Sequence, residues 1–205
     1  MDNSAMYKIS YGLYVLTTKD EQGKDNGCIV NTVSMLTDNP KRIVVFVNNA
    51  NYTAETLKKT RAFNVSVLTE NAPFDVYKRF GFQSGKDVDK FDGFPCNRTG
   101  NGLYYLDKEA NAVISAWVTD YYEYGTHTLF VAEVADAKTL SDGKSVTYEY
   151  YQQNVKPKPQ AKAPEKAEKE KWVCKICGYE HEGELPDDFI CPWCKHPASD
   201  FERIS

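Results

Sequence analysis

Two Cys-x-x-Cys pairs near the end of the chain restrict its fold more than any other feature. Cys174 and Cys177 form the first pair, and Cys191 and Cys194 form the second after a gap of 13 residues. Each pair holds two sulfur atoms on one tight turn, so four thiolates can surround a single ion tetrahedrally. A piece as short as residues 172–205 buries too little apolar surface to fold alone, and we expect a bound metal to stabilise it.

The donor set leaves two metals open, because tetrahedral four-sulfur sites hold both iron and zinc. Iron would make the site an electron carrier, whereas zinc would make it a ribbon that only stabilises the domain. Backbone amides directed at the sulfurs would tune the potential of an iron site. His181 and His196 offer spare nitrogens, but four thiolates already complete the shell, so we expect both to be surface residues.

The rest of the composition narrows the class of protein. The two remaining cysteines, Cys28 and Cys96, are expected to be small buried side chains, as in a reducing cytoplasm. The net charge of −4 gives no electrostatic reason to bind nucleic acid. No stretch approaches the ~18 apolar residues of a membrane span, and the first residues lack a signal-peptide pattern. We therefore expect a cytoplasmic protein without a membrane or nucleic-acid partner.

Residues 156–171 divide the chain. They consist of Lys, Pro, Ala, Glu and Gln, with no aromatic or branched aliphatic side chain. Such a stretch contributes nothing to a core and is typical of a flexible tether. The sequence thus predicts a domain over residues 1–155, a linker over 156–171 and a metal domain over 172–205.

Apolar patterning in the first 155 residues predicts many strands and only short helices. Alternating or continuous apolar runs bounded by turn residues indicate strands. The run over residues 42–47 is typical of a strand buried on both faces. Strands joined by hairpins favour an antiparallel barrel. The predicted strands are 9–19, 28–35, 42–47, 63–68, 112–122, 126–135 and 145–151, the helices are 53–60 and 74–80, and 82–95 is a loop.

Six short segments of this region occur in a familiar order. They are GLYVLT at 12–17, NTVS at 31–34, NNANYT at 48–53, FNVSVL at 63–68, FGFQSG at 80–85 and GTHTLF at 125–130. Together they resemble the flavin reductase family, whose fold is an FMN-binding split β-barrel. A Rossmann-type site has no support, because the chain lacks Walker and Gly-x-Gly-x-x-Gly motifs. The resemblance implies a mainly β domain with short helices that binds FMN.

The same resemblance implies roles for individual residues. The segment at 31–34 would face the flavin ring, the helix start at Thr53 would seat the phosphate, and Lys90 would offset its charge. His127 would lie near the nicotinamide. Each residue also has a plainer explanation as a turn residue, a strand end, a solvated lysine or a hydrogen-bonded histidine. The candidate FMN residues are Asn31, Thr32, Val33, Ser34, Asn48, Asn49, Tyr52, Thr53, Gln83, Ser84, Gly85 and Lys90.

The cysteine segment carries a second resemblance. An aromatic residue stands two positions before the first cysteine, CGY and HEG follow, and CPWC is succeeded by HP and FE. This pattern resembles the rubredoxins, and most closely the short rubredoxin-like domain of rubrerythrins. It implies one iron ion on the four cysteines. Lys195 departs from the pattern, since full-length rubredoxins usually carry Gly after the fourth cysteine.

The order of the two domains resembles the high-molecular-weight rubredoxins of anaerobic bacteria. That resemblance implies an electron-transfer enzyme that takes electrons from NADH or NADPH through FMN to iron. The acceptor would be a flavodiiron protein that reduces oxygen or nitric oxide. FMN suits this task because it accepts two electrons at once and releases them singly. Split-barrel flavoproteins are commonly homodimers, and the resemblance implies a homodimer here as well.

Two other functions remain open from the sequence. The chain could be a flavin-containing electron carrier without an NAD(P)H site of its own, reduced by a separate enzyme. It could instead be a non-redox binding protein in which a structural zinc ribbon serves for docking. Anaerobic mixing with NADH separates the first from an NAD(P)H-dependent enzyme, and a visible spectrum separates iron from zinc.

Overall fold

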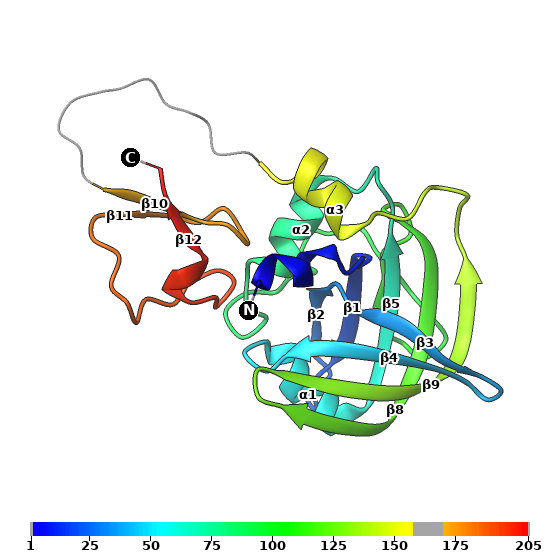
Figure 1. Cartoon of the computed structure of the whole chain (residues 1–205). Coiled ribbons are helices and arrows are strands. Elements are labelled where there is room, and N and C mark those ends of the chain that lie inside the picture. Colours follow the sequence, from blue (N-terminus) through cyan, green and yellow to red (C-terminus); the bar gives the residue numbers. More distant parts are fainter. Residues whose placement is uncertain (1, 158–169, 205) are drawn as a thin grey trace. The chain divides into compact units, whose positions relative to one another are not determined.

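Figure 1 shows the computed structural model, which describes residues 2–157 and 170–204. The chain divides into two compact units, Met1–Asn154 and Val155–Ser205. Most of the predicted linker, residues 158–169, lies outside the described residues, so its flexibility stays a prediction.

Seven antiparallel strands build the first unit and curl into a barrel (Figure 1). They follow one another in the sheet in the order β2-β1-β5-β8-β9-β4-β3. This arrangement confirms the prediction of a mainly β barrel. The strands are β1 Tyr14–Lys19, β2 Asp25–Val30, β3 Val33–Asp38, β4 Lys41–Asn48, β5 Ala62–Leu68, β8 Ala110–Tyr124 and β9 His127–Thr139.

Short helices and two small strands fill the connections. Both predicted helices are present, each within one residue of its expected bounds, whereas the first strand begins at Tyr14 instead of residue 9. In the described part of the chain, no helix combines the length and apolar character that a membrane crossing requires. The elements are η1 Asn3–Lys8, α1 Tyr52–Thr60, α2 Phe74–Gly81, β6 Asn97–Arg98, β7 Tyr104–Tyr105, α3 Tyr148–Tyr150 and η2 Tyr151–Val155.

The two edge strands of the sheet, β2 and β3, are consecutive in the chain. Asn31 and Thr32 lie between them outside any strand, and the amide of Phe46 in β4 donates to the carbonyl of Thr32 at 3.2 Å. The Thr32 hydroxyl donates to the side-chain oxygen of Asn31 at 3.0 Å. The predicted single strand over 28–35 is therefore wrong, because the chain bends at Asn31 and its pairing partner changes from β1 to β4.

One face of the strands forms the core of the barrel. Ala54 and Leu57 of α1 pack against it, and both are almost fully buried. In β4, Val45 is completely buried whereas Phe46 is 36% exposed. The prediction that residues 42–47 are buried on both faces is therefore wrong, because only alternate side chains of β4 point into the core.

The last predicted strand, residues 145–151, is also wrong. Ser145 and Thr147 make only isolated bridges. The Thr147 side chain accepts a hydrogen bond from the amide of Tyr150 at 3.1 Å and caps the start of α3. A capping Thr thus directs this aromatic stretch into helical turns.

The second unit is a small antiparallel sheet in the order β11-β10-β12. Aromatic rings replace an aliphatic core: the centre of the Tyr179 ring lies 5.3 Å from that of Trp193, and Phe189 lies 5.4 Å from Phe201. Strand β10 ends at the first cysteine of the first pair. The elements are β10 Lys171–Cys174, β11 Glu180–Glu182, η3 Ala198–Asp200 and β12 Phe201–Arg203.

Candidate metal centre and flavin site

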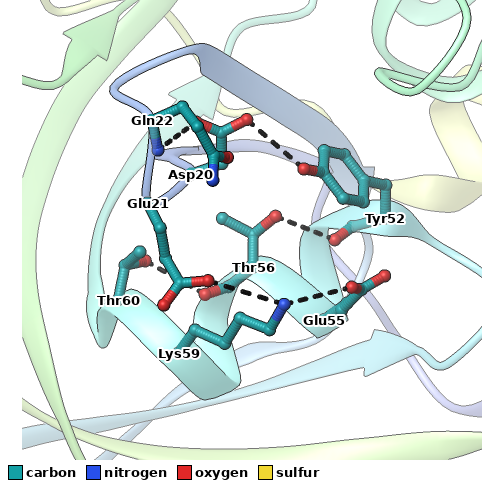
Figure 2. Close-up of a pocket in the computed structure, with 8 residues that line it drawn as sticks. All are labelled: Asp20, Glu21, Gln22, Tyr52, Glu55, Thr56, Lys59 and Thr60. Carbon is teal, nitrogen blue, oxygen red and sulfur yellow. Dashed lines mark hydrogen bonds and ion pairs between the residues drawn. The ribbon is translucent and has the colours of Figure 1, made fainter.

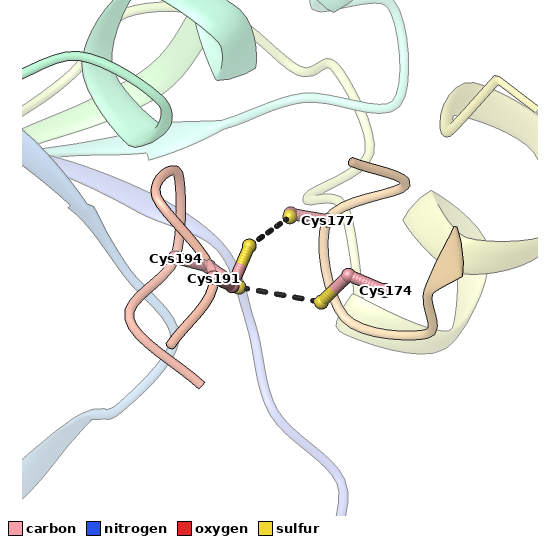
Figure 3. A group of neighbouring side chains, drawn as sticks. All are labelled: Cys174, Cys177, Cys191 and Cys194. Carbon is pink, nitrogen blue, oxygen red and sulfur yellow. Dashed lines mark hydrogen bonds between the residues drawn. The ribbon is translucent and has the colours of Figure 1, made fainter. Parts of the chain in front are cut away.

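The four cysteines of the second unit converge on one point (Figure 3). Their sulfur atoms all lie within 4.8 Å of one another. The sulfurs of Cys174 and Cys194 are 3.5 Å apart, and those of Cys177 and Cys191 are 3.4 Å apart. Four sulfurs at about 2.3 Å from a common ion would be about 3.8 Å apart, so this donor set fits a tetrahedral metal ion.

The two cysteine turns repeat the same backbone hydrogen bonds. The amide of Gly178 donates to the carbonyl of Cys174 at 2.8 Å, and the amide of Lys195 donates to that of Cys191 at 2.9 Å. The amide of each first cysteine donates to the carbonyl five residues later, at 2.8 Å in both turns. This repeat explains why the spacing of the two pairs suffices to predict the ligand set.

Backbone amides favour the thiolate form at all four cysteines. Hydrogen bonding among the sulfurs has the largest influence on each of the four pKa values. Beyond that, a nearby amide lowers the pKa of every thiol, as expected of amides directed at sulfur. The amides of Cys177, Tyr179, Cys194 and His196 act on Cys174, Cys177, Cys191 and Cys194 respectively.

The other candidate ligands stay outside this group. His181 Nε2 lies 3.1 Å from the carbonyl oxygen of Glu184, and His196 Nδ1 lies 3.0 Å from that of Cys194. Both rings are half-buried, so they are less exposed than expected. In the first unit, Cys28 is buried as predicted, whereas Cys96 is only half-buried.

The segment predicted to face the flavin ring lies at the start of β3, beside two further strands of the first unit. Strand β3 pairs with β4, and β4 pairs with β9. Val33 stands opposite Val45, and Asn48 stands opposite His127. The segment at 31–34 and His127, nearly a hundred positions apart in the sequence, therefore flank the same end of β4.

The start of α1 provides a place for an anionic group. Its N-cap, Asn51, makes no side-chain capping bond, so that side chain leaves the first-turn amides to other partners. Lys86 lies beside it, with Nζ 5.3 Å from the centre of the Tyr52 ring. The same ammonium pairs with Glu55 at 3.2 Å. A positive helix end next to a lysine suits a phosphate.

Thr53, by contrast, is enclosed at this helix start. It is 1% exposed, and its hydroxyl accepts a hydrogen bond from Asn26 Nδ2 at 3.0 Å. Asn26 is 2% exposed, and its Oδ1 has no hydrogen-bond partner. A Cβ on Gly85 would lie 2.1 Å from that oxygen, so only glycine lets the loop approach here. Sequence patterns gave no signal for Asn26.

Lys90 is turned toward the backbone. It is 4% exposed, and its Nζ donates to the carbonyls of Gly27 at 2.8 Å and Phe80 at 3.3 Å. Burial lowers the pKa of Lys90 to about 8. These bonds tie the 82–91 loop to β2 and α2, and a role for Lys90 in offsetting phosphate charge stays a prediction.

The rest of this loop is held by one local bond and one bond from the β1–β2 turn. The Ser84 hydroxyl accepts from the amide of Lys86 at 3.2 Å, and the carbonyl of Gly85 accepts from Lys24 Nζ at 3.0 Å. Gln83 is exposed. Lys86, which the sequence did not single out, lies at the helix start through its contacts with Tyr52 and Glu55.

A small polar pocket lies between the β1–β2 turn and α1 (Figure 2). Tyr52, a predicted FMN residue, donates its hydroxyl to Asp20 at 3.3 Å. Lys59 pairs with Glu21 at 3.6 Å and Glu55 at 3.3 Å. Carboxylates outnumber cations here, so the pocket does not suit a phosphate. Its lining is Asp20, Glu21, Gln22, Tyr52, Glu55, Thr56, Lys59 and Thr60.

The end of β4 and the β8–β9 turn meet at the remaining candidates. Asn48 Oδ1 accepts from the amide of Ala50 at 2.9 Å. Asn49 Nδ2 donates to the carbonyl of Gly125 at 2.8 Å. His127 is exposed, and its Nδ1 lies 2.9 Å from the Thr126 hydroxyl. Short amide and hydroxyl groups beside an open helix start fit the polar ring and the phosphate of a flavin.

Comparison with known proteins finds two families, one matching each compact unit of the chain. The family described as flavin reductase like domain matches residues 6–158. The family described as rubrerythrin, rubredoxin-like domain matches residues 172–202.

Three relatives illustrate the similarity. A high molecular weight rubredoxin of Moorella thermoacetica is 32% identical over 230 residues, covering 100% of both chains. A ferric-chelate reductase (NAD(P)H) of Archaeoglobus fulgidus is 42% identical over 151 residues, 74% of this chain and 89% of its own. The styrene monooxygenase flavin reductase of Pseudomonas putida superposes with a TM-score of 0.59 at 25% identity, over 70% and 89% of the chains. The chain therefore belongs to the flavin reductase family and carries a C-terminal rubredoxin-like domain, the fusion expected from its sequence.

Proposed function

We propose that this protein takes electrons from NADH or NADPH, uses FMN, and passes them to the four-cysteine iron and then to an acceptor protein. One observation carries the proposal: a flavin reductase barrel and four sulfurs within 4.8 Å of one another occur in the same chain. When bound, FMN would accept two electrons as a hydride and release them one at a time. The four-cysteine iron takes one electron at a time.

The barrel residues would bind and orient these molecules. The segment at 31–34 and Asn48 offer amide and hydroxyl groups to the flavin ring, and the start of α1 with Lys86 offers a positive site to the phosphate. Ser84 and Gly85 lie on the loop that would cover the ribityl chain. His127, exposed beside Asn48, would orient the nicotinamide, since its ring is already held by the Thr126 hydroxyl.

The choice of donor and acceptor rests on relatives. The ferric-chelate reductase (NAD(P)H) is 42% identical over 151 residues, which supports a pyridine nucleotide as donor. As acceptor we favour a flavodiiron-type protein that reduces oxygen or nitric oxide, as the resemblance to high-molecular-weight rubredoxins implies.

A homodimer is part of the proposal. Large aromatic side chains are exposed on the strands beside the flavin residues: Phe46 by 36%, Trp117 by 49%, Tyr122 by 51% and Tyr124 by 64%. In the ladder, Phe46 and Tyr122 both stand opposite Leu129, so they share one face of the sheet. An apolar face of this kind suits a second copy of the chain.

The test is anaerobic mixing of the purified protein with NADH and with NADPH, followed by visible absorbance. The flavin and ferric-thiolate bands should both bleach, and iron bleaching should vanish once FMN is stripped. A ferric-thiolate band that bleached equally fast without flavin would contradict the proposal. A flavin that no pyridine nucleotide reduced would favour a carrier served by another enzyme, and a colourless zinc-loaded second unit would favour a docking ribbon.

A second acceptor follows from the same relative. Ferric complexes could take electrons directly from the barrel, as the name of the Archaeoglobus fulgidus protein indicates for that enzyme. The Cys177→Ser variant separates the two routes. Ferric-chelate reduction that persists without the four-cysteine iron would assign it to the barrel, and its loss would assign it to the second unit.

A further inference from the structure

Asn49, just beyond the end of β4, binds the β8–β9 turn with its backbone and with both ends of its side chain. Its Nδ2 donates to the carbonyl of Gly125 at 2.8 Å, and its Oδ1 accepts from the Thr128 hydroxyl at 2.6 Å. Its backbone amide donates to the carbonyl of Thr126 at 2.9 Å. These bonds reach the residues on both sides of His127.

The bond to Thr128 is sheltered from water. Thr128 is completely buried, so its hydroxyl depends on a partner within the protein. The carboxamide of Asn49 supplies that partner and at the same time binds a turn carbonyl. The NH₂ group and the carbonyl oxygen of the Asn49 carboxamide each make one bond to the turn, and together these bonds fix its orientation. Asn49 is thus oriented by the turn, although the sequence placed it among the flavin contacts.

His127 depends on this turn for its place. It stands opposite Asn48 in the β4–β9 ladder and opposite Tyr124 in the β8–β9 hairpin. Its Nδ1 is bonded to the hydroxyl of Thr126, whose carbonyl Asn49 binds. Moving the turn away from β4 would therefore move both the ring and the hydroxyl that orients it.

We propose that Asn49 is a positioning residue, which fixes the β8–β9 turn so that His127 meets the nicotinamide, and that it does not contact the flavin. This inference rests on the proposed function, in which His127 orients a pyridine nucleotide. It predicts that disturbing Asn49 impairs reduction by NADH without loss of FMN.

Three variants of the full-length protein test the role. Asn49→Ala removes both side-chain bonds, and Thr128→Val removes one hydroxyl with little change of shape. Thr128→Ser keeps the hydroxyl and should therefore keep the rate of FMN reduction. The matched control is Asn111→Ala, because Asn111 Nδ2 binds the carbonyl of Gly143 at 2.7 Å at the opposite end of β8.

The first readout is stopped-flow reduction of FMN by NADH, with FMN content measured in parallel. Asn49→Ala and Thr128→Val should slow reduction roughly 10- to 100-fold. Thr128→Ser and Asn111→Ala should stay near the wild-type rate. In the His127→Ala background, Asn49→Ala should cause no further loss. Loss of FMN from Asn49→Ala, or an effect that adds fully to that of His127→Ala, overturns the proposal.

The second readout does not depend on NADH. Nitrogen NMR of the three imidazole rings reports the tautomer of His127, which the His127→Ala spectrum assigns. Asn49→Ala should shift this signal and leave His181 and His196 unchanged. If no pyridine nucleotide reduces the protein, the proposed function fails on its own. An unaltered His127 signal in Asn49→Ala then overturns the positioning role separately.

Discussion

Gly178 and Lys195 adopt the same left-handed backbone conformation, with φ of 78° and 62°, each directly after the second cysteine of its pair. Glycine enters this conformation freely, whereas a residue with a Cβ is strained there by about 1–2 kcal/mol. The second turn therefore carries a strain that the first avoids.

Replacing Lys195 by Gly should stabilise the metal domain by about 1 kcal/mol, and Gly178→Ala should destabilise it by a similar amount. Iron release in guanidinium, followed by loss of the visible band, measures both changes. Lys175→Gly, which alters an exposed lysine of the first turn without a positive φ, is the control. A stabilisation by Lys175→Gly equal to that by Lys195→Gly would count against backbone strain.

Replacing Cys177 by Ser should abolish iron binding and leave the flavin in place. A serine hydroxyl does not ionise near neutral pH, so the site loses one of its four thiolate ligands. Metal analysis together with the visible spectrum checks the outcome, and Cys96→Ser, which lies outside the ligand group, is the control. A normal iron spectrum in Cys177→Ser would refute the four-cysteine site.

Replacing His127 by Ala should slow flavin reduction by NADH roughly tenfold or more while FMN content stays unchanged. The ring stands opposite Asn48, at the end of the strand that the flavin residues flank. Stopped-flow rates compared with those of His196→Ala, which alters a histidine of the other unit, isolate the effect. Equal rates in both variants would assign His127 a purely structural role.

Replacing Gly85 by Ala should destabilise the barrel by about 1–3 kcal/mol and weaken FMN binding, because the new Cβ would meet Asn26 Oδ1 at 2.1 Å. Asn26→Ala combined with Gly85→Ala removes the clash and should recover part of both losses. Gly100→Ala is the control, since nothing lies within 4 Å of a Cβ there. Thermal unfolding and flavin fluorescence titration measure the two effects.

Lys90 should make the free energy of unfolding rise with pH between about 8 and 10.5. Burial lowers the pKa of Lys90 from 10.5 to about 8, so between these values the unfolded chain binds more protons here than the folded one. The penalty is complete below about pH 8 and disappears above 10.5, a gain of about 3 kcal/mol at most. Denaturant unfolding of flavin-free wild type and Lys90→Met over this range checks it, and parallel pH profiles would disprove it.

The metal centre could be predicted from the sequence because its ligands lie within a short segment. Cys174 and Cys194 are 20 positions apart, and each turn is closed by backbone bonds between its first cysteine and the residues four and five positions later. Local spacing therefore determines the geometry. The mainly β barrel could be predicted for a similar reason, since alternation and turn residues mark each strand separately.

The contacts of the candidate flavin residues could not be predicted in this way. Lys90 binds the carbonyl of Gly27, 63 positions away, and Asn49 binds Thr128, 79 positions away. Nothing in the sequence distinguishes a lysine that faces solvent from one that faces a buried carbonyl. The bend at Asn31 was missed because no glycine or proline marks it, and the cap at Thr147 was missed because a single capping bond overrides the surrounding aromatic pattern.

The closeness of the four sulfurs makes metal-free protein vulnerable to air. Thiols within 4.8 Å of one another can pair as soon as one of them is oxidised. Two pairings would cross-link the turns and exclude iron. Loading with iron therefore has to precede exposure to oxygen, and a preparation that lost its metal in air needs a thiol reductant before it can be reconstituted.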